Sequence, residues 1–133
     1  YRQKINHAIK VLSKMNFLSS ELLNSDTIST FIEMGADVLN GLVDLYIQQS
    51  SKEVNIISEL IQKGDLESAR KTIHSLKGAS FNTGAQKMGD ICLSLEKGIK
   101  ENDMTTIAKL AEQLPSALAQ TRQAFDELLS SLA

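Results

Sequence analysis

The spacing of apolar residues constrains the fold of this chain more than any other feature of its sequence. Leu, Ile, Val and Ala recur at intervals of three and four residues almost throughout, and no segment shows sustained alternation of apolar and polar residues. The first pattern is typical of amphipathic helices, whereas alternation would indicate strands. Tryptophan is absent and there are only four Phe and two Tyr, so the core must be largely aliphatic. The sequence therefore predicts an all-α protein.

Turn-forming and capping residues divide this pattern into segments. In order, we expect an apolar stripe at 5–15, a short helix ending near 35, helices over about 39–61, 66–82 and 88–99, and a final helix after 103. Gly64 and Gly84 suit the left-handed position that follows a helix. Asp65 and Asp103 suit the N-cap of the next one. The short helix is expected to be capped by Ser25 or Asp26.

Short connections between long amphipathic helices force neighbouring helices to run antiparallel. We therefore predict an up-down-up-down four-helix bundle over residues 25–133, preceded by an N-terminal helical extension or linker over residues 1–24. Pro115 interrupts the last apolar stripe, where it either kinks the helix or begins a new segment. Because the chain begins with Tyr1, we expect it to be a piece of a longer protein.

Charge and composition exclude several classes of function. The formal charge of −2 argues against nucleic acid as the main partner, since such proteins usually carry a basic face. No apolar run approaches the roughly 18 residues that a membrane span needs, so no direct membrane contact is expected. Cys92 is the single cysteine and cannot form an intrachain disulfide, which favours the cytoplasm. We expect a monomer.

The segment 65–83 carries an unusual outer surface. At about 100° per residue, its core-facing side collects a set of apolar and small residues: Ala69, Thr72, Ile73, Leu76, Ser80 and Thr83. His74 points the other way, with Arg70, Lys77 and Gly78 around it and Phe81 one turn further along. A glycine inside a helix costs about 0.8–1 kcal/mol relative to alanine. Gly78 therefore indicates that something approaches the helix closely beside His74.

The run His74-Ser75-Leu76-Lys77-Gly78, followed by Gly84-Ala85, resembles the signature of the histidine phosphotransfer family. The resemblance extends to the Cys-x-x-Leu-Glu pattern that ends at Glu96, and it covers roughly residues 28–130. It implies an antiparallel four-helix bundle with a phosphoaccepting histidine on its second helix. Thr83 and Phe81 depart from the commonest family pattern, which leaves the choice of partner open.

The resemblance also implies a role for each site residue. His74 would be the phosphoacceptor, and Lys77, with Arg70 as a second cation, would steady the phosphoryl oxygens. Gly78 would leave room for the partner. Glu96 would accept a hydrogen bond from the other ring nitrogen of His74, although a salt bridge with Lys97 or Lys100 is the alternative.

We expect the partner to dock around Gly78, Phe81 and the exposed flank of the helix at 39–61. In this view Phe81 is an exposed aromatic anchor. In the alternative it turns inward and caps the end of the core, so that its loss would lower stability and leave partner affinity unchanged.

The resemblance implies a phosphocarrier rather than an enzyme. His74 would accept a phosphoryl group from the aspartate of one receiver domain and pass it to a second receiver. No metal or cofactor is expected in this chain, because the receivers supply their own Mg²⁺. The parent would be a hybrid sensor histidine kinase, in the cytoplasm or at the inner membrane, or the chain would be a free-standing shuttle. Two alternatives are a chemotaxis-kinase domain phosphorylated by an ATP-binding domain and a non-catalytic docking bundle.

Overall fold

The computed structural model describes residues 21–132, which form five α-helices and no strand. The helices are α3 (Ser25–Met34), α4 (Ala36–Gln62), α5 (Leu66–Thr83), α6 (Gln86–Lys100) and α7 (Met104–Leu132). The prediction of an all-α chain is therefore confirmed over this range. The predicted stripe at 5–15 lies outside the described residues.

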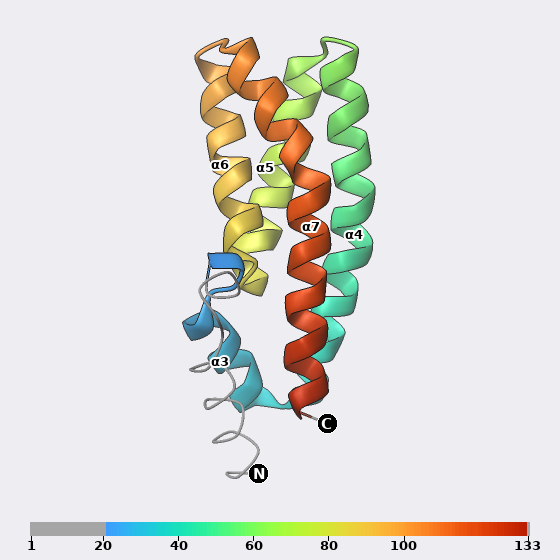
Figure 1. The fold of residues 1–133 in the computed structure, drawn as a ribbon, viewed down its shortest axis with the longest axis vertical. Helices are drawn as coiled ribbons and strands as arrows, with labels where there is room; N and C mark the ends of the chain where they lie inside the picture. The colour runs from blue at the N-terminus through green and yellow to red at the C-terminus, as the bar shows by residue number, and fades with distance from the viewer. Residues whose placement is uncertain (1–20, 133) are drawn as a thin grey trace.

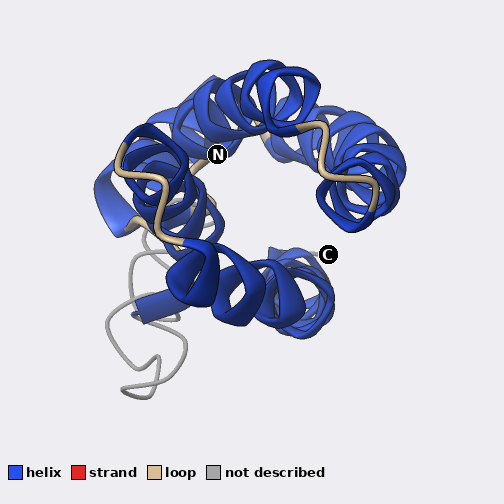
Figure 2. Cartoon of the chain, turned by 90° about the horizontal axis from the view of Figure 1, so that it is seen from above, coloured by secondary structure: helices blue, strands red, loops and turns tan. Residues whose placement is uncertain are grey.

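The four long helices form the predicted antiparallel bundle. Helices α4, α5, α6 and α7 stand side by side and alternate in direction along the chain (Figure 1). Seen from above, they close into a ring in which α4 and α6 each pack against both α5 and α7 (Figure 2). Their inward faces bury a largely aliphatic core that includes the aromatic rings of Phe125 and Tyr46. This packing places α5 between α4 and α6.

The ends of α5 follow the predicted turn chemistry. Gly64 and Gly84 adopt φ angles of +79° and +89°, in the left-handed region that glycine tolerates best. Asp65 caps the start of α5, and its Oδ1 accepts a hydrogen bond from the Ser68 backbone N–H at 3.1 Å. Asp103 caps α7 in the same way through the Thr106 N–H. These caps fix where α5 begins and ends, and so fix which residues face out.

Helix α3 begins one residue earlier than expected. The N-cap is Asn24 rather than Ser25 or Asp26, and its side chain accepts a hydrogen bond from the Thr27 N–H at 3.0 Å. The Asn24 backbone N–H also donates to the Gly84 carbonyl at 2.8 Å. This second bond is a tertiary contact, which local sequence does not reveal. Leu22 and Leu23, which the sequence assigned to the extension, are buried in the core.

Helix α7 continues through Pro115 without interruption, so the proline does not begin a new segment. The Pro115 side chain is exposed, which keeps the ring out of the core. Within residues 21–132, no helix is both long and apolar enough to cross a membrane.

Candidate functional site

Helix α5 presents His74 to solvent because the opposite face of the helix fills the core. The predicted core face is confirmed except at Thr72, which is half-buried. The His74 side chain is 66% exposed. The buried residues of the predicted face are Ala69, Ile73, Leu76, Ser80 and Thr83. On the buried side of α5, the Ser80 hydroxyl forms a 2.7 Å hydrogen bond with the Tyr46 hydroxyl of α4. The exposed histidine therefore lies on a helix whose rotation is fixed by packing.

Glu96 on α6 connects the two charged partners of the site. Its Oε2 lies 3.2 Å from His74 Nδ1, and its Oε1 lies 2.6 Å from Lys77 Nζ. The carboxylate therefore pairs with both site residues on α5, and the alternative of a bridge to Lys97 or Lys100 is not what the structure contains. The contact that the resemblance implied between Glu96 and the ring nitrogen is present.

The charge state of Glu96 determines which ring nitrogen of His74 carries the hydrogen. Partial burial raises the pKa of the Glu96 carboxyl, but hydrogen bonds from Lys77 and His74 outweigh this effect and leave the pKa below its usual range. An ionised carboxylate can only accept hydrogen bonds. His74 Nδ1 must then donate, and in the neutral ring Nε2 keeps its lone pair free.

Gly78 leaves an open place on the surface one turn after His74. A Cβ atom built at this position would meet no other atom within 4 Å. The glycine is therefore not required by packing inside the bundle. This observation supports the expectation that it leaves room for an approaching partner.

Phe81 is not the exposed anchor that the sequence suggested. Its side chain is half-buried, and its ring lies so close to Gly89 on α6 that a Cβ atom there would overlap it. The ring thus packs between α5 and α6, as in the inward alternative. Periodicity placed Phe81 on the outer side of α5 but could not show that α6 offers a glycine to receive the ring.

Arg70 is paired within its own helix, and its expected role as a second cation stays a prediction. Its guanidinium forms an ion pair with Glu67 within α5, at 2.6 Å between Nη2 and Oε1. Arg70 thus pairs one turn away from His74, with its own helix. Lys77 is the cation that shares a partner with the histidine.

Glu53 is a residue near the site that the sequence analysis did not single out. Its side chain is only 5% exposed on α4, and it accepts hydrogen bonds from Gln49 and from Ser75, the neighbour of His74. Burial raises the pKa of this carboxyl above its usual range, and the two hydrogen bonds offset part of that rise. The available signal was its spacing, three residues after Ser50 and four before Ile57, which places it on the buried face of α4.

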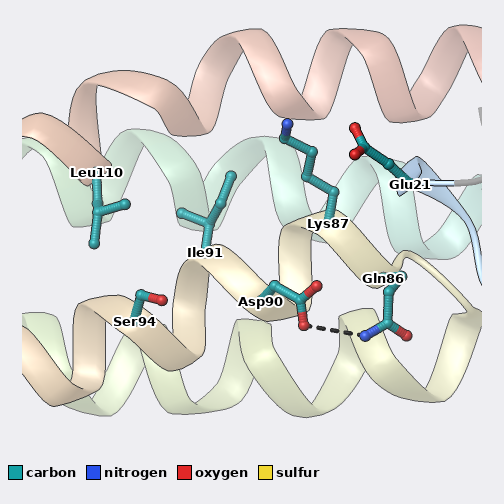
Figure 3. A pocket seen from close by; sticks show the side chains of 7 residues that line it. All are labelled: Glu21, Gln86, Lys87, Asp90, Ile91, Ser94 and Leu110. Atoms are coloured by element: carbon teal, nitrogen blue, oxygen red, sulfur yellow. Dashed lines mark hydrogen bonds between the residues drawn. The ribbon is translucent and has the colours of Figure 1, made fainter. Parts of the chain in front are cut away.

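A groove of about 440 Å³ lies elsewhere, where α6 meets Glu21 and Leu110 of α7 (Figure 3). Its α6 wall includes Gln86 and Asp90, which are joined by a 3.0 Å hydrogen bond. His74 does not line it. Within residues 21–132, no three His, Cys, Asp or Glu side chains gather in a way that could hold a metal ion. Cys92 is buried in the core, and burial raises the pKa of its thiol to about 12.

Comparison with known proteins agrees with this geometry. The family model described as the Hpt domain matches residues 41–124, which include α5, α6 and most of α4 and α7. The chain belongs to the Hpt domain family. The match includes His74, Lys77 and Glu96, so the whole site lies within the Hpt region.

Several Hpt relatives resemble the chain over most of its length. The phosphorelay protein LuxU of Vibrio harveyi is 21% identical over 109 residues, covering 81% of this chain and 96% of LuxU. The crystal structure of histidine-containing phosphotransfer protein B of Pseudomonas aeruginosa has a TM-score of 0.74 and 26% identity, covering 81% of this chain and 94% of that one. A putative histidine-containing phosphotransfer protein from rice shares the fold, with a TM-score of 0.78 at 17% identity over 98% of this chain and 96% of its own.

Proposed function

We propose that this Hpt domain is a phosphocarrier in a phosphorelay, in which His74 accepts a phosphoryl group from the aspartate of one receiver domain and transfers it to a second. The observation that carries the proposal is the contact of an ionised Glu96 with Nδ1 of an exposed histidine. This contact leaves Nε2 as the nucleophile.

The exchange needs no proton to leave the histidine. The Nε2 lone pair forms a bond to phosphorus while the bond from phosphorus to the aspartyl oxygen breaks, and the aspartate departs as a carboxylate. The ring then carries a positive charge with its hydrogen still on Nδ1. Glu96 accepts that hydrogen bond and stabilises the charge as it develops. The reverse reaction with a second aspartate releases the phosphoryl group.

Lys77 would steady the equatorial oxygens of the transferring group. Its ammonium pairs with Glu96 Oε1 before the phosphoryl group arrives. It would therefore exchange one acidic partner for another as transfer proceeds, and a flexible lysine side chain suits such a movement.

The chain would act as a carrier rather than as an enzyme, with Mg²⁺ supplied by the receiver. We also propose that it operates in the cytoplasm, as a free-standing carrier or as the phosphotransfer domain of a hybrid sensor kinase. In either case its partners would be receiver domains.

The direct test is phosphoryl transfer from receivers. A panel of receiver domains from the source organism is loaded with acetyl phosphate and mixed with the chain, and acid-labile phosphate on the chain is followed over time. The parent chain should be labelled and His74→Gln should not, with unchanged helical content by circular dichroism. Lys77→Ala should still be labelled, but more slowly. Labelling of His74→Gln, or no labelling of the parent by any receiver, would contradict the proposal.

A further inference from the structure

We infer that Phe81 and Gly89 are positioning residues, and that their contact sets the distance at which Glu96 meets His74. This inference rests on the proposed function, because it takes the Glu96–His74 contact as part of phosphoryl transfer. Phe81 lies seven residues beyond His74 on α5, so it does not act on the reacting atoms directly. It acts through the position of α6.

Gly89 lets the Phe81 ring lie directly against the backbone of α6. Gly89 is buried, and a Cβ atom built on it would overlap the ring. Two of the ring atoms would lie 2.6 Å and 2.8 Å from that Cβ atom, whereas ordinary van der Waals contacts span 3.4–4 Å. A methyl group at this position must therefore displace either the ring or the helix by roughly 1 Å.

This contact and the Glu96–His74 contact belong to one register of the two antiparallel helices. His74 precedes Phe81 by seven residues on α5, and Gly89 precedes Glu96 by seven residues on α6. Seven residues are close to two helical turns, so on each helix the two contacting residues share one face. A movement of α6 away from α5 at Gly89 therefore also moves Glu96 away from His74.

The start of α6 is held in place and cannot absorb such a movement. The Asn24 side chain donates a hydrogen bond to Gln86 Oε1 at 3.2 Å, and the Asn24 backbone N–H donates to the Gly84 carbonyl at 2.8 Å. The helix then runs unbroken from Gln86 to Lys100. A displacement beyond its fixed start tilts the helix and is passed on along its length.

The Glu96–His74 contact has little margin for this displacement. Glu96 Oε2 lies 3.2 Å from His74 Nδ1, at the long end of the range of roughly 2.7–3.2 Å for such hydrogen bonds. Withdrawal by a further 1 Å or so, the displacement that a methyl group at Gly89 requires, would break it. Lys77 could follow Glu96, because its side chain is long and flexible. The Phe81–Gly89 contact thus controls whether Nδ1 keeps its acceptor.

The experiment changes this contact from both sides and compares it with a matched control. The variants are Gly89→Ala, Phe81→Ala, the two combined, and Gly98→Ala. Gly98 is also a buried glycine of α6, but a Cβ atom there would meet Ile107 of α7, at 3.3 Å, rather than α5. Gly98→Ala therefore strains α6 on its other side.

Three measurements are made on each variant. Nitrogen-15 NMR of the imidazole shows which ring nitrogen of His74 carries the hydrogen, and it needs no receiver. The spectrum of His74→Gln identifies the signals of His7, the other histidine of the chain. Transfer rates are measured at subsaturating and saturating receiver, and urea unfolding gives the stability.

Gly89→Ala should shift the His74 hydrogen toward Nε2 and lower the saturating transfer rate about tenfold, the effect of losing one hydrogen bond to a charged group. The receiver concentration for half-maximal transfer should change little, because Gly89 is buried. Phe81→Ala adds no overlap, so it folds even where Gly89→Ala does not, and it should shift the same signals in the same direction. The combined variant should lie closer to the parent than either single variant. Gly98→Ala should lower stability but keep the parent's ring signals and rate.

Unchanged ring signals in both Gly89→Ala and Phe81→Ala would overturn the inference, because the ring would then move without α6. An equal shift in Gly98→Ala would also overturn it, since any strain on α6 would have the same effect. A parent chain that no receiver labels, but whose ring signals respond as expected, would contradict the proposed function and support the positioning role.

Discussion

Glu96 makes two contacts, one with each of the residues that would handle the phosphoryl group. The Lys77 contact is the shorter of the two, at 2.6 Å against 3.2 Å for His74. The positive charge of Lys77 is therefore balanced at rest by the same carboxylate that contacts the histidine. In the proposed transfer, the oxygens of an arriving phosphoryl group would compete with Glu96 for Lys77, and the His74 contact would remain to stabilise the charged ring.

Glu53 should lower stability at neutral pH. Because burial raises its pKa, the folded chain binds a proton more readily than the unfolded chain between the ordinary and the raised pKa. Stability therefore falls as pH rises through that window and stays lower above it. We expect Glu53→Gln to be more stable than the parent at pH 7, with a difference that shrinks toward zero in acid. Urea unfolding between pH 4 and pH 8 measures this.

The neighbours of Glu53 do not titrate in this pH window, so the pH dependence of stability can be assigned to Glu53. Tyr46 and Cys92 interact electrostatically with Glu53, and burial raises the pKa of both, that of Cys92 to about 12. Both groups stay neutral across this window. A parallel pH profile for variant and parent would show that Glu53 does not titrate differently in the folded state.

Replacing Gly78 and Gly84 with alanine should change the free energy of unfolding in opposite directions. Gly84 has φ +89°, and a Cβ atom there would lie 2.9 Å from Ile28 Cγ1. Gly84→Ala therefore forces both a strained backbone and a close contact, and should cost roughly 1–3 kcal/mol of unfolding free energy. Chemical denaturation at neutral pH measures the loss.

Gly78→Ala is the matched control, because it lies inside the helix with open space around it. It should stabilise the chain by up to about 1 kcal/mol through helix propensity. If both glycines proved equally costly to replace, the open place beside His74 would not exist as described. Gly78→Ala should also slow transfer from a receiver, since its methyl group narrows that place.

Helix α3 should unfold together with the bundle. Ile28 is fully buried, and it contacts the turn between α5 and α6 at Gly84. Ile28→Ala should therefore lower the unfolding free energy of the whole chain by about 2–5 kcal/mol, the cost of a buried cavity of this size. Urea unfolding followed by circular dichroism should show one transition at a lower midpoint.

Two separate transitions, or an unchanged midpoint, would show instead that α3 is a peripheral addition to the four long helices. Val38→Ala provides a control, since this exposed residue at the start of α4 should change stability by less than about 0.5 kcal/mol.

Local patterns were sufficient to predict the helices, their order and most of their ends. Glycine in the left-handed region and aspartate at the N-cap act within one turn of the chain, so Gly64, Asp65, Gly84 and Asp103 could be assigned without tertiary information. The face of α5 that carries His74 followed from periodicity in the same way. The predicted N-cap of α3, Ser25 or Asp26, was wrong, because the actual cap, Asn24, is also positioned by a hydrogen bond to the distant Gly84 carbonyl.

The amino-acid pattern alone was enough to predict an all-α chain with His74 on the outer face of its second bundle helix, because helix formation and helix faces depend on residues three and four apart. The contacts between helices, by contrast, were needed to show that Phe81 rests on Gly89 and that Lys77 pairs with Glu96. Each of these contacts depends on the rotation and register of one helix against another. Packing of the whole bundle sets those two quantities, and the periodicity of a single helix leaves them free.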